Sequence, residues 1–275
     1  MGMEENRKMD LDILINSAVE IGNRLGGQKN PVDQESLYYA EGLGQKIISH
    51  IISVRHLYHG QQLTIGANRY PTQIDFASIA ILVRAAMETY LTLNHVFISA
   101  TENEERRFRF LCWHLAGFLD RKDFEPKNKA QLDLINSERE SIDRLTHEIQ
   151  SSPCFIALNK KQQGAILKGS WRIDSSWGTL AVNAGFDEGF FKQQYKFLCG
   201  YAHSSRLSVI QIQQSRSLEK QQEMADASVG VAMVVLAKFM FDYIQLIPAL
   251  KEAQNELEAF AIIYVWKTIG ERLEK

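Results

Sequence analysis

The chain has 275 residues, of which 45% are hydrophobic and 23% are charged, and this composition excludes a wholly disordered chain, a collagen and a coiled-coil rod. Lys and Arg total 31 against 33 Asp and Glu, so the formal charge is -2 and no global basic field attracts nucleic acid. At about 150 residues per domain, the length allows one large domain or two small ones.

Helical periodicity dominates the chain, and few prolines or glycines interrupt it. The expected helices span residues 10–25, 33–62, 71–99, 102–123, 128–150, 188–202, 217–247 and 250–273. Gly26 and Gly27 are expected to end the first helix, and Pro248 to bend or end the seventh. The glycine-containing stretch 150–190 predicts short helices and loops, and 205–213 is the only plausible strand.

These patterns predict an all-α fold: a single bundle-like domain of roughly eight helices with an irregular insertion near residues 150–190. We expect it to comprise N-terminal helices over 1–70, a core over 71–215 and a C-terminal helical hairpin over 216–275. The chain contains no phosphate-binding glycine loop, no dinucleotide fingerprint, no HExxH and no GxSxG. Kinases, P-loop ATPases, Rossmann dehydrogenases, zincins and α/β-hydrolases are therefore not expected.

Three widely spaced cysteines, Cys112, Cys154 and Cys199, form no CxxC pair. We expect reduced thiols, no bound metal and no cofactor. Residues 1–10 are polar and carry no apolar segment of the signal-peptide type, so a cytoplasmic location is expected.

Two apolar stretches, 74–98 and 229–247, approach the length of a membrane span. Each carries charged or ionisable residues inside: Arg84, Glu88 and His95 in the first, and Lys238 and Asp242 in the second. Because a charge at mid-bilayer costs roughly 3 kcal/mol, the prediction is two buried core helices and no membrane span.

The first of these helices carries a polar stripe. With an advance of about 100° per residue, Glu88 lies about 40° from Arg84 and His95 about 20° from it. Arg84 and Glu88 are spaced to pair at i,i+4. Two interpretations stay open, because buried charges need partners: an internal ion pair that fixes the helix in place, or a cleft that binds a ligand.

A second candidate constellation lies in the following helix, where Arg107 and Arg109 precede His114. Six residues separate Arg107 from His114, so the two lie about 20° apart on a helix. A His and an Arg are the minimal equipment for RNA cleavage, since the His acts as general acid or base and the Arg stabilises the phosphorane charge. The alternative is a solvated arginine cluster beside a half-buried histidine.

The segment QYKFLCGYAHSSR, residues 194–206, concentrates polar chemistry after an apolar turn. Tyr195, Lys196, Tyr201 and His203 are its candidate binding or catalytic residues. We expect Tyr and His side chains from this segment to bond the Arg84–Glu88 stripe from a neighbouring helix. A structural role for His203, capping a helix end, is the alternative.

LVRAAMETYL (82–91), followed much later by YKFLCGYAHSS (195–205), resembles uncharacterised bacterial all-helical proteins with an Arg-x-x-x-Glu helix and a late Tyr…His-Ser segment. The late segment also resembles a degenerate form of the HEPN signature (higher eukaryote and prokaryote nucleotide-binding), in which an Arg precedes a His by four to six residues. Here the basic residue is Lys196, so the implied active pair is Lys196 with His203, or Arg109 with His114 by spacing.

The resemblance implies a metal-independent ribonuclease or an RNA- or nucleotide-binding component of a defence or toxin–antitoxin system. It also implies a homodimer or an antitoxin-like partner. The alternative expectation is a non-catalytic helical interaction module, in which the network of Arg84, Glu88 and His95 is purely structural.

Overall fold

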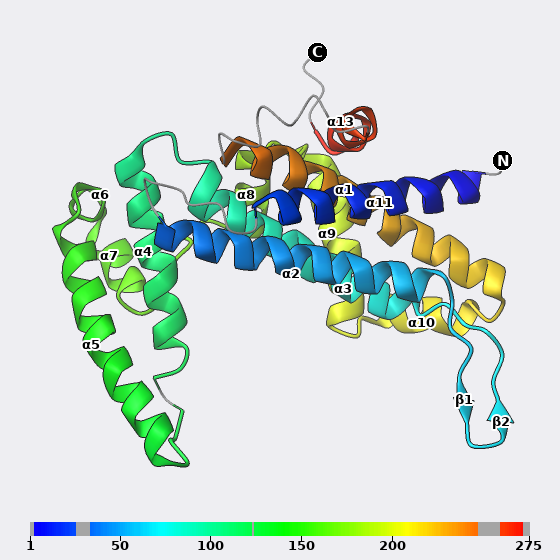
Figure 1. The fold of residues 1–275 in the computed structure, drawn as a ribbon, viewed down its shortest axis with the longest axis horizontal. Coiled ribbons are helices and arrows are strands. Elements are labelled where there is room, and N and C mark those ends of the chain that lie inside the picture. Colours follow the sequence, from blue (N-terminus) through cyan, green and yellow to red (C-terminus); the bar gives the residue numbers. More distant parts are fainter. Residues whose placement is uncertain (1–2, 26–33, 123, 247–258, 272–275) are drawn as a thin grey trace. The chain divides into compact units, whose positions relative to one another are not determined.

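The structure is a computed structural model that describes residues 3–25, 34–122, 124–246 and 259–271. Its helices and one small hairpin are drawn in Figure 1. The first half contains α1 (Met3–Leu25), α2 (Gln34–Tyr58), β1 (Thr64–Ile65), β2 (Asn68–Arg69), α3 (Phe76–Leu93), the π-helical turn η1 (Asn94–Ile98) and α4 (Asn103–Leu119). The second half contains α5 (Lys129–Ser151), α6 (Pro153–Ile156), α7 (Lys160–Ile166), α8 (Trp177–Asn183), α9 (Glu188–Ala202), α10 (Arg206–Gln214), α11 (Leu218–Leu246) and α13 (Phe260–Ile269).

The all-α prediction is confirmed, whereas the predicted number of roughly eight helices is wrong. The described residues form twelve α-helices besides η1. The excess comes from short helices: α6, α7 and α8 lie in the stretch where short helices and loops were expected, and α10 lies where the strand was expected. Side-chain caps start three of them, since Ser152, Asn159 and Ser205 each accept a hydrogen bond from a backbone N–H of the first turn.

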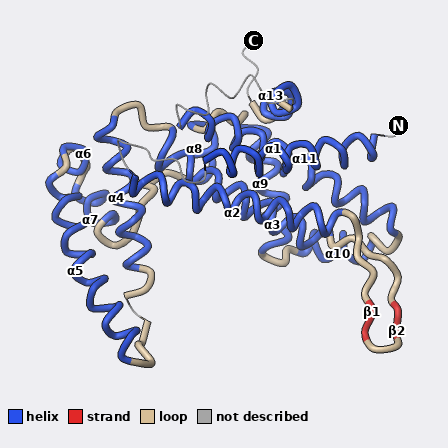
Figure 2. Tube along the Cα trace, viewed as in Figure 1, coloured by secondary structure: helices blue, strands red, loops and turns tan. Residues whose placement is uncertain are grey.

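A β-hairpin replaces the expected end of the second helix. The second helix stops at Tyr58, four residues early, and Gly60 follows at φ +76°. β1 and β2 then pair antiparallel around Gly66, whose φ of +59° suits a tight hairpin turn. Figure 2 shows the two strands as the red segments of a hairpin that extends away from the helices beside it.

Contacts within the chain divide it into two compact units, residues 1–93 with 181–275, and residues 94–180. This division differs from the expected boundaries at residues 70 and 215. Gly26, Gly27 and Pro248, and residues 250–258 of the expected last helix, lie outside the described residues.

The larger unit is built around α3, which packs against α2, α9 and α11. Polar groups on these buried helices find partners across the helix interfaces. Tyr90 Oη donates to Asp242 Oδ2 over 2.6 Å, and Tyr58 Oη donates to Asp226 Oδ1 over 2.6 Å. These bonds satisfy the hydroxyl groups of two fully buried tyrosines and so offset the cost of burying them.

Two helices, Phe76–Ile98 and Leu218–Leu246, have the length and hydropathy to cross a membrane. Their most apolar windows are 61% and 72% buried against the rest of the protein. Core helices of globular proteins meet the same criterion, so length and hydropathy alone are weak evidence for a membrane span.

The smaller unit has a core of its own between α4 and α5, closed by the short helices. Its buried residues are Phe108, Leu111, Cys112, Leu115, Leu145, Ile149, Phe155 and Ile166. Trp171 and Ile173 pack against this core from the loop before α8. Ile173 and Asp174 in that loop adopt positive φ angles of 50° and 64°, which is unusual for a β-branched residue such as Ile173.

Gly270 allows α13 to pack closely on α11, and replacing it by Ala tests that packing. An added Cβ would lie far inside van der Waals contact with Val234 of α11. We expect Gly270→Ala to lower the free energy of unfolding by about 1–3 kcal/mol through overpacking. Gly230→Ala is the matched control, because its Cβ meets nothing within 4 Å and an Ala in mid-helix adds about 0.5–1 kcal/mol. Urea unfolding of both variants measures the difference; equal effects would contradict the close packing at Gly270.

Candidate functional site

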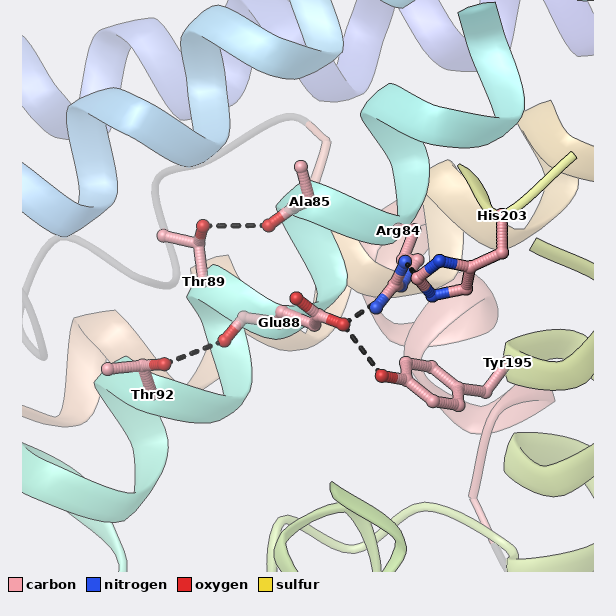
Figure 3. Close-up of polar contacts among 7 residues, drawn as sticks. All are labelled: Arg84, Ala85, Glu88, Thr89, Thr92, Tyr195 and His203. Carbon is pink, nitrogen blue, oxygen red and sulfur yellow. Dashed lines mark hydrogen bonds and ion pairs between the residues drawn. The ribbon is translucent and has the colours of Figure 1, made fainter. Parts of the chain in front are cut away.

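The polar stripe on α3 forms the centre of a cluster in the larger unit (Figure 3). Arg84 Nε donates to Glu88 Oε1 over 2.9 Å, the i,i+4 pair that the sequence predicted. The two side chains are 20% and 26% exposed, so this is a half-buried pair at the edge of the core. Nearby hydroxyls of Thr89 and Thr92 are satisfied by backbone carbonyls of α3 itself.

α9 contributes a phenol to the same carboxylate. Tyr195 Oη donates to Glu88 Oε1 over 2.6 Å, and its ring lies 5.5 Å from the Arg84 guanidinium carbon. Burial, together with the hydrogen bond to Glu88, raises the pKa of Tyr195 well above its usual range. Tyr195 therefore keeps its proton and serves as a hydrogen-bond donor that holds Glu88 in place.

The fourth member is His203, the residue that ends α9. Arg84 Nη1 lies 3.2 Å from His203 Nε2, and Figure 3 shows the two side chains facing one another. A guanidinium only donates hydrogen bonds, so in this contact Nε2 is the acceptor. His203 is also exposed to solvent, which leaves the ring open to a ligand.

The backbone around His203 presents that ring at a sharp corner between two helices. His203 N donates to Cys199 O at the end of α9, and Ser204 takes a positive φ of 50°. Ser205 then starts α10, as its side chain accepts from Ser208 N. His203 thus has both the helix-terminal position and the contact with the stripe that the sequence left as alternatives.

Cys199 is a neighbour of the cluster that sequence analysis did not single out. It lies one turn from Tyr195 and one turn from His203, so all three share one face of α9. The i, i+4, i+8 spacing of these three residues was the available signal.

Among the described residues, His95 shares no hydrogen bond or ring contact with Arg84, Glu88, Tyr195 or His203. It lies in η1, the π-helical turn that follows α3. The contacts group it with the smaller unit, where its ring packs 5.9 Å from Trp171. Burial, and secondarily the charges of Arg109 and Arg172, lower the pKa of His95 to about 4.

The depressed pKa of His95 predicts a pH-dependent stability. The folded-state pKa of about 4 lies below the ordinary value of 6.5, so the neutral ring is favoured by folding. Its contribution is complete above pH 6.5 and is lost as the pH falls toward 4. We expect the wild type to lose about 3 kcal/mol more than His95→Asn between neutral pH and pH 4. Urea unfolding across this range measures it, and parallel curves for both proteins would refute the assignment.

Arg107 and Arg109 each form hydrogen bonds to acceptors in the smaller unit. Arg107 Nη2 pairs with Glu148 Oε1 over 2.9 Å. Arg109 donates to three oxygen acceptors: His95 O, Ser99 Oγ and Glu105 Oε1. These bonds fix both guanidinium groups within the smaller unit.

His114 lies in an aromatic stack in the same unit. Its ring centroid is 5.0 Å from that of Phe118 and 5.4 Å from that of Phe110. Half-buried between two phenyl rings, His114 fits a packing position better than a position on a substrate.

Lys196 and Tyr201, the remaining predicted residues, differ in setting. Lys196 is exposed on α9, seven residues before His203 and therefore on the same face. Tyr201 is buried, donates to Gln211 Oε1 over 2.9 Å, and packs edge-on against Phe76. Through these two contacts Tyr201 joins α9 to α10 and α3. Burial also raises the pKa of Tyr201 to about 12, so the phenol stays protonated.

In the described residues, no three His, Cys, Asp or Glu side chains gather closely enough to hold a metal ion. The cluster of Arg84, Glu88, Tyr195 and His203 combines a guanidinium, a carboxylate, a phenol and an imidazole on α3 and at the end of α9. No known protein family, curated protein or solved structure is significantly similar to the chain.

Proposed function

We propose that Arg84, Glu88, Tyr195 and His203 form the active site of a metal-independent ribonuclease of the HEPN type. The observation that carries the proposal is the 3.2 Å approach of Arg84 Nη1 to the solvent-exposed His203. A guanidinium and a neutral imidazole this close act on one phosphodiester together. The imidazole removes a proton, and the guanidinium stabilises the charge that develops on phosphorus oxygens.

The hydrogen bond between Arg84 and His203 provides a way to activate the base on substrate binding. In the free protein the Nε2 lone pair accepts from Arg84. Phosphate oxygens are stronger acceptors for a guanidinium than an imidazole is, and they bind it in a two-pronged geometry. A bound phosphodiester therefore draws Arg84 to itself and frees Nε2 to accept another proton.

The reaction that follows is an internal transfer at phosphorus. His203 Nε2 takes the proton of the ribose 2′-OH, the 2′ oxygen bonds to phosphorus, and the bond from phosphorus to the 5′ oxygen breaks. Water supplies a proton to the 5′ oxygen, and His203 later returns its own proton to solvent. The products are a 2′,3′-cyclic phosphate end and a 5′-hydroxyl end, so DNA, which lacks the 2′-OH, is not cleaved.

Glu88 and Tyr195 act as positioning residues in this scheme. Both the Arg84 guanidinium and the Tyr195 phenol donate to the same oxygen of Glu88, which orients Arg84 toward His203. Lys196, exposed on the His203 face of α9, adds positive charge for the RNA backbone. Because the segment 195–205 resembles the HEPN signature, we propose that the protein acts in a defence or toxin–antitoxin system. Its partner would be a second copy of the chain or an antitoxin-like protein.

RNA cleavage by the purified protein tests the proposal. Wild type, His203→Ala and His114→Ala are incubated with total RNA in the presence of EDTA. We expect cleavage by wild type and by His114→Ala, with 2′,3′-cyclic phosphate ends, and its loss in His203→Ala. Circular dichroism establishes that both variants are folded. Absence of cleavage by wild type refutes the proposal, and loss in His114→Ala alone places the base in the smaller unit.

The alternative is a non-catalytic helical interaction module. One observation favours it: Arg84, Glu88, Tyr195 and His203 already satisfy one another, as a structural network requires. In that case wild type leaves RNA intact, and His203→Ala alters stability without any change in RNA cleavage.

A further inference from the structure

A cavity of about 350 Å³ lies in the larger unit between α1, α2 and α11. Its volume falls in the range of small-molecule pockets, near 300–1,000 Å³. Small residues open it on the helix walls: Ala18 and Gly22 on α1 and Gly44 on α2. None of the residues proposed for RNA cleavage lines it.

Two aromatic rings of α11 form one wall of the cavity. The centroids of Phe239 and Tyr243 lie 5.0 Å apart, with the rings tilted by 31°. Gly44 allows this wall to sit against α2, because a Cβ at that position would meet Phe239 at 3.2 Å. The two rings give the cavity an apolar wall of π systems.

Glu41 lies at the same cavity and is the only charged residue among the described residues that line it. Its side chain is half-buried and forms no hydrogen bond or ion pair with a described residue. Burial, and then the negative charge of Glu41, raise the pKa of Tyr243 above its usual range. The carboxylate is therefore close enough to Tyr243 to interact with it electrostatically. A half-buried carboxylate that pairs with no described residue attracts a cation, because burial of an unpaired charge is costly.

We propose that this cavity binds a small organic cation, an amine whose apolar body packs on Phe239 and Tyr243 while its ammonium group pairs with Glu41. Carboxylate and aromatic faces both attract an ammonium group, the carboxylate by charge and the rings by the cation–π interaction. The same features repel an anion, and a single carboxylate gives too few oxygens for a calcium or magnesium ion. Exposed side chains of Gln45 and Asn23 supply further hydrogen-bonding groups at the rim.

Isothermal titration calorimetry with two probes of equal shape tests this site. Phenethylamine is a cation at neutral pH, and phenethyl alcohol is its neutral counterpart. We expect the amine to bind the wild type at least about tenfold more tightly than the alcohol does. In Glu41→Gln this preference is expected to vanish, because only the charge of the side chain changes.

Glu20→Gln is the matched control, since Glu20 is exposed on α1, pairs with Arg24 and does not line the cavity. It is expected to bind both probes as the wild type does. Equal affinity of the two probes for the wild type, or an amine preference that survives in Glu41→Gln, overturns the proposal. So does the absence of saturable binding of the amine up to about 10 mM, where affinity falls below that of a specific site. The probe comparison on the wild type needs no variant, so the test stands even if Glu41→Gln misfolds.

Discussion

Replacing Arg84 by Lys is expected to lower the rate of RNA cleavage by about 100-fold or more, although the positive charge remains. Arg84 uses Nε for Glu88 and Nη1 for His203, two donors that point in different directions. A lysine ammonium is a single point of charge on a flexible stem, and it does not reproduce a planar fork with two fixed directions. The loss is expected in kcat more than in KM, since the charge that attracts RNA is retained.

Tyr195→Phe is expected to have a smaller effect on RNA cleavage than Arg84→Lys. It removes one hydrogen bond to Glu88 but leaves the bond between Arg84 and Glu88 intact. Cleavage is expected to fall by less than about tenfold, equivalent to roughly 1.4 kcal/mol of transition-state stabilisation. Single-turnover cleavage of a short labelled RNA measures both rates. Full activity in Arg84→Lys would contradict a directional role for Arg84, and a larger loss in Tyr195→Phe than in Arg84→Lys would point to Tyr195 itself.

The cluster was partly predictable because one helix carries half of it. Arg84 and Glu88 meet by local spacing, which depends only on the helical period. The need of buried charges for partners then predicted contacts from the late Tyr and His segment, and Tyr195 and His203 make them. Which of the segment's polar residues face the stripe was not predictable, because His203 lies just past the last residue of α9, where its φ of -109° and ψ of 17° depart from helical values.

Short-range and tertiary contacts decide features that periodicity does not predict. His95 follows α3 in the π-helical turn η1, and its ring packs on Trp171 of the smaller unit. Residues 205–213 were expected to form a strand, yet the cap from Ser205 starts the helix α10 there. Arg107 and Arg109 lie near His114 in sequence, but Glu148 and Glu105 pair with them, and tertiary ion pairs such as that with Glu148 are not visible in a linear pattern.

Glu271→Gln is expected to destabilise the larger unit by about 3–5 kcal/mol, because it leaves a buried ammonium without a counter-charge. Lys238 is 2% exposed, and its Nζ donates to Glu271 Oε1 over 2.9 Å. Lys267 Nζ reaches the other carboxylate oxygen, Oε2, over 2.8 Å. A glutamine keeps the shape of the side chain but removes the negative charge that both ammonium groups share.

The free energy of unfolding at low pH depends on the same carboxylate, that of Glu271. Burial opposes ionisation of Glu271, but its hydrogen bonds to Lys267 and Lys238 outweigh burial and lower its pKa below the ordinary 4.5. A lowered folded-state pKa gives a contribution that is complete above pH 4.5 and lost as the pH falls through the folded-state value. Wild type is therefore expected to lose this part of its stability on acidification, whereas Glu271→Gln has none of it to lose.

The double variant Lys238→Met with Glu271→Gln separates the cost of an unpaired charge from the loss of packing. A methionine fills nearly the same volume without a charge, and replacing a buried ion pair by apolar groups is close to neutral for stability. We therefore expect the double variant to regain most of the 3–5 kcal/mol lost in Glu271→Gln, to within about 1 kcal/mol of the wild type. Urea unfolding of the wild type and both variants measures these differences. If the double variant is as unstable as Glu271→Gln, the unpaired buried ammonium is not the source of the loss.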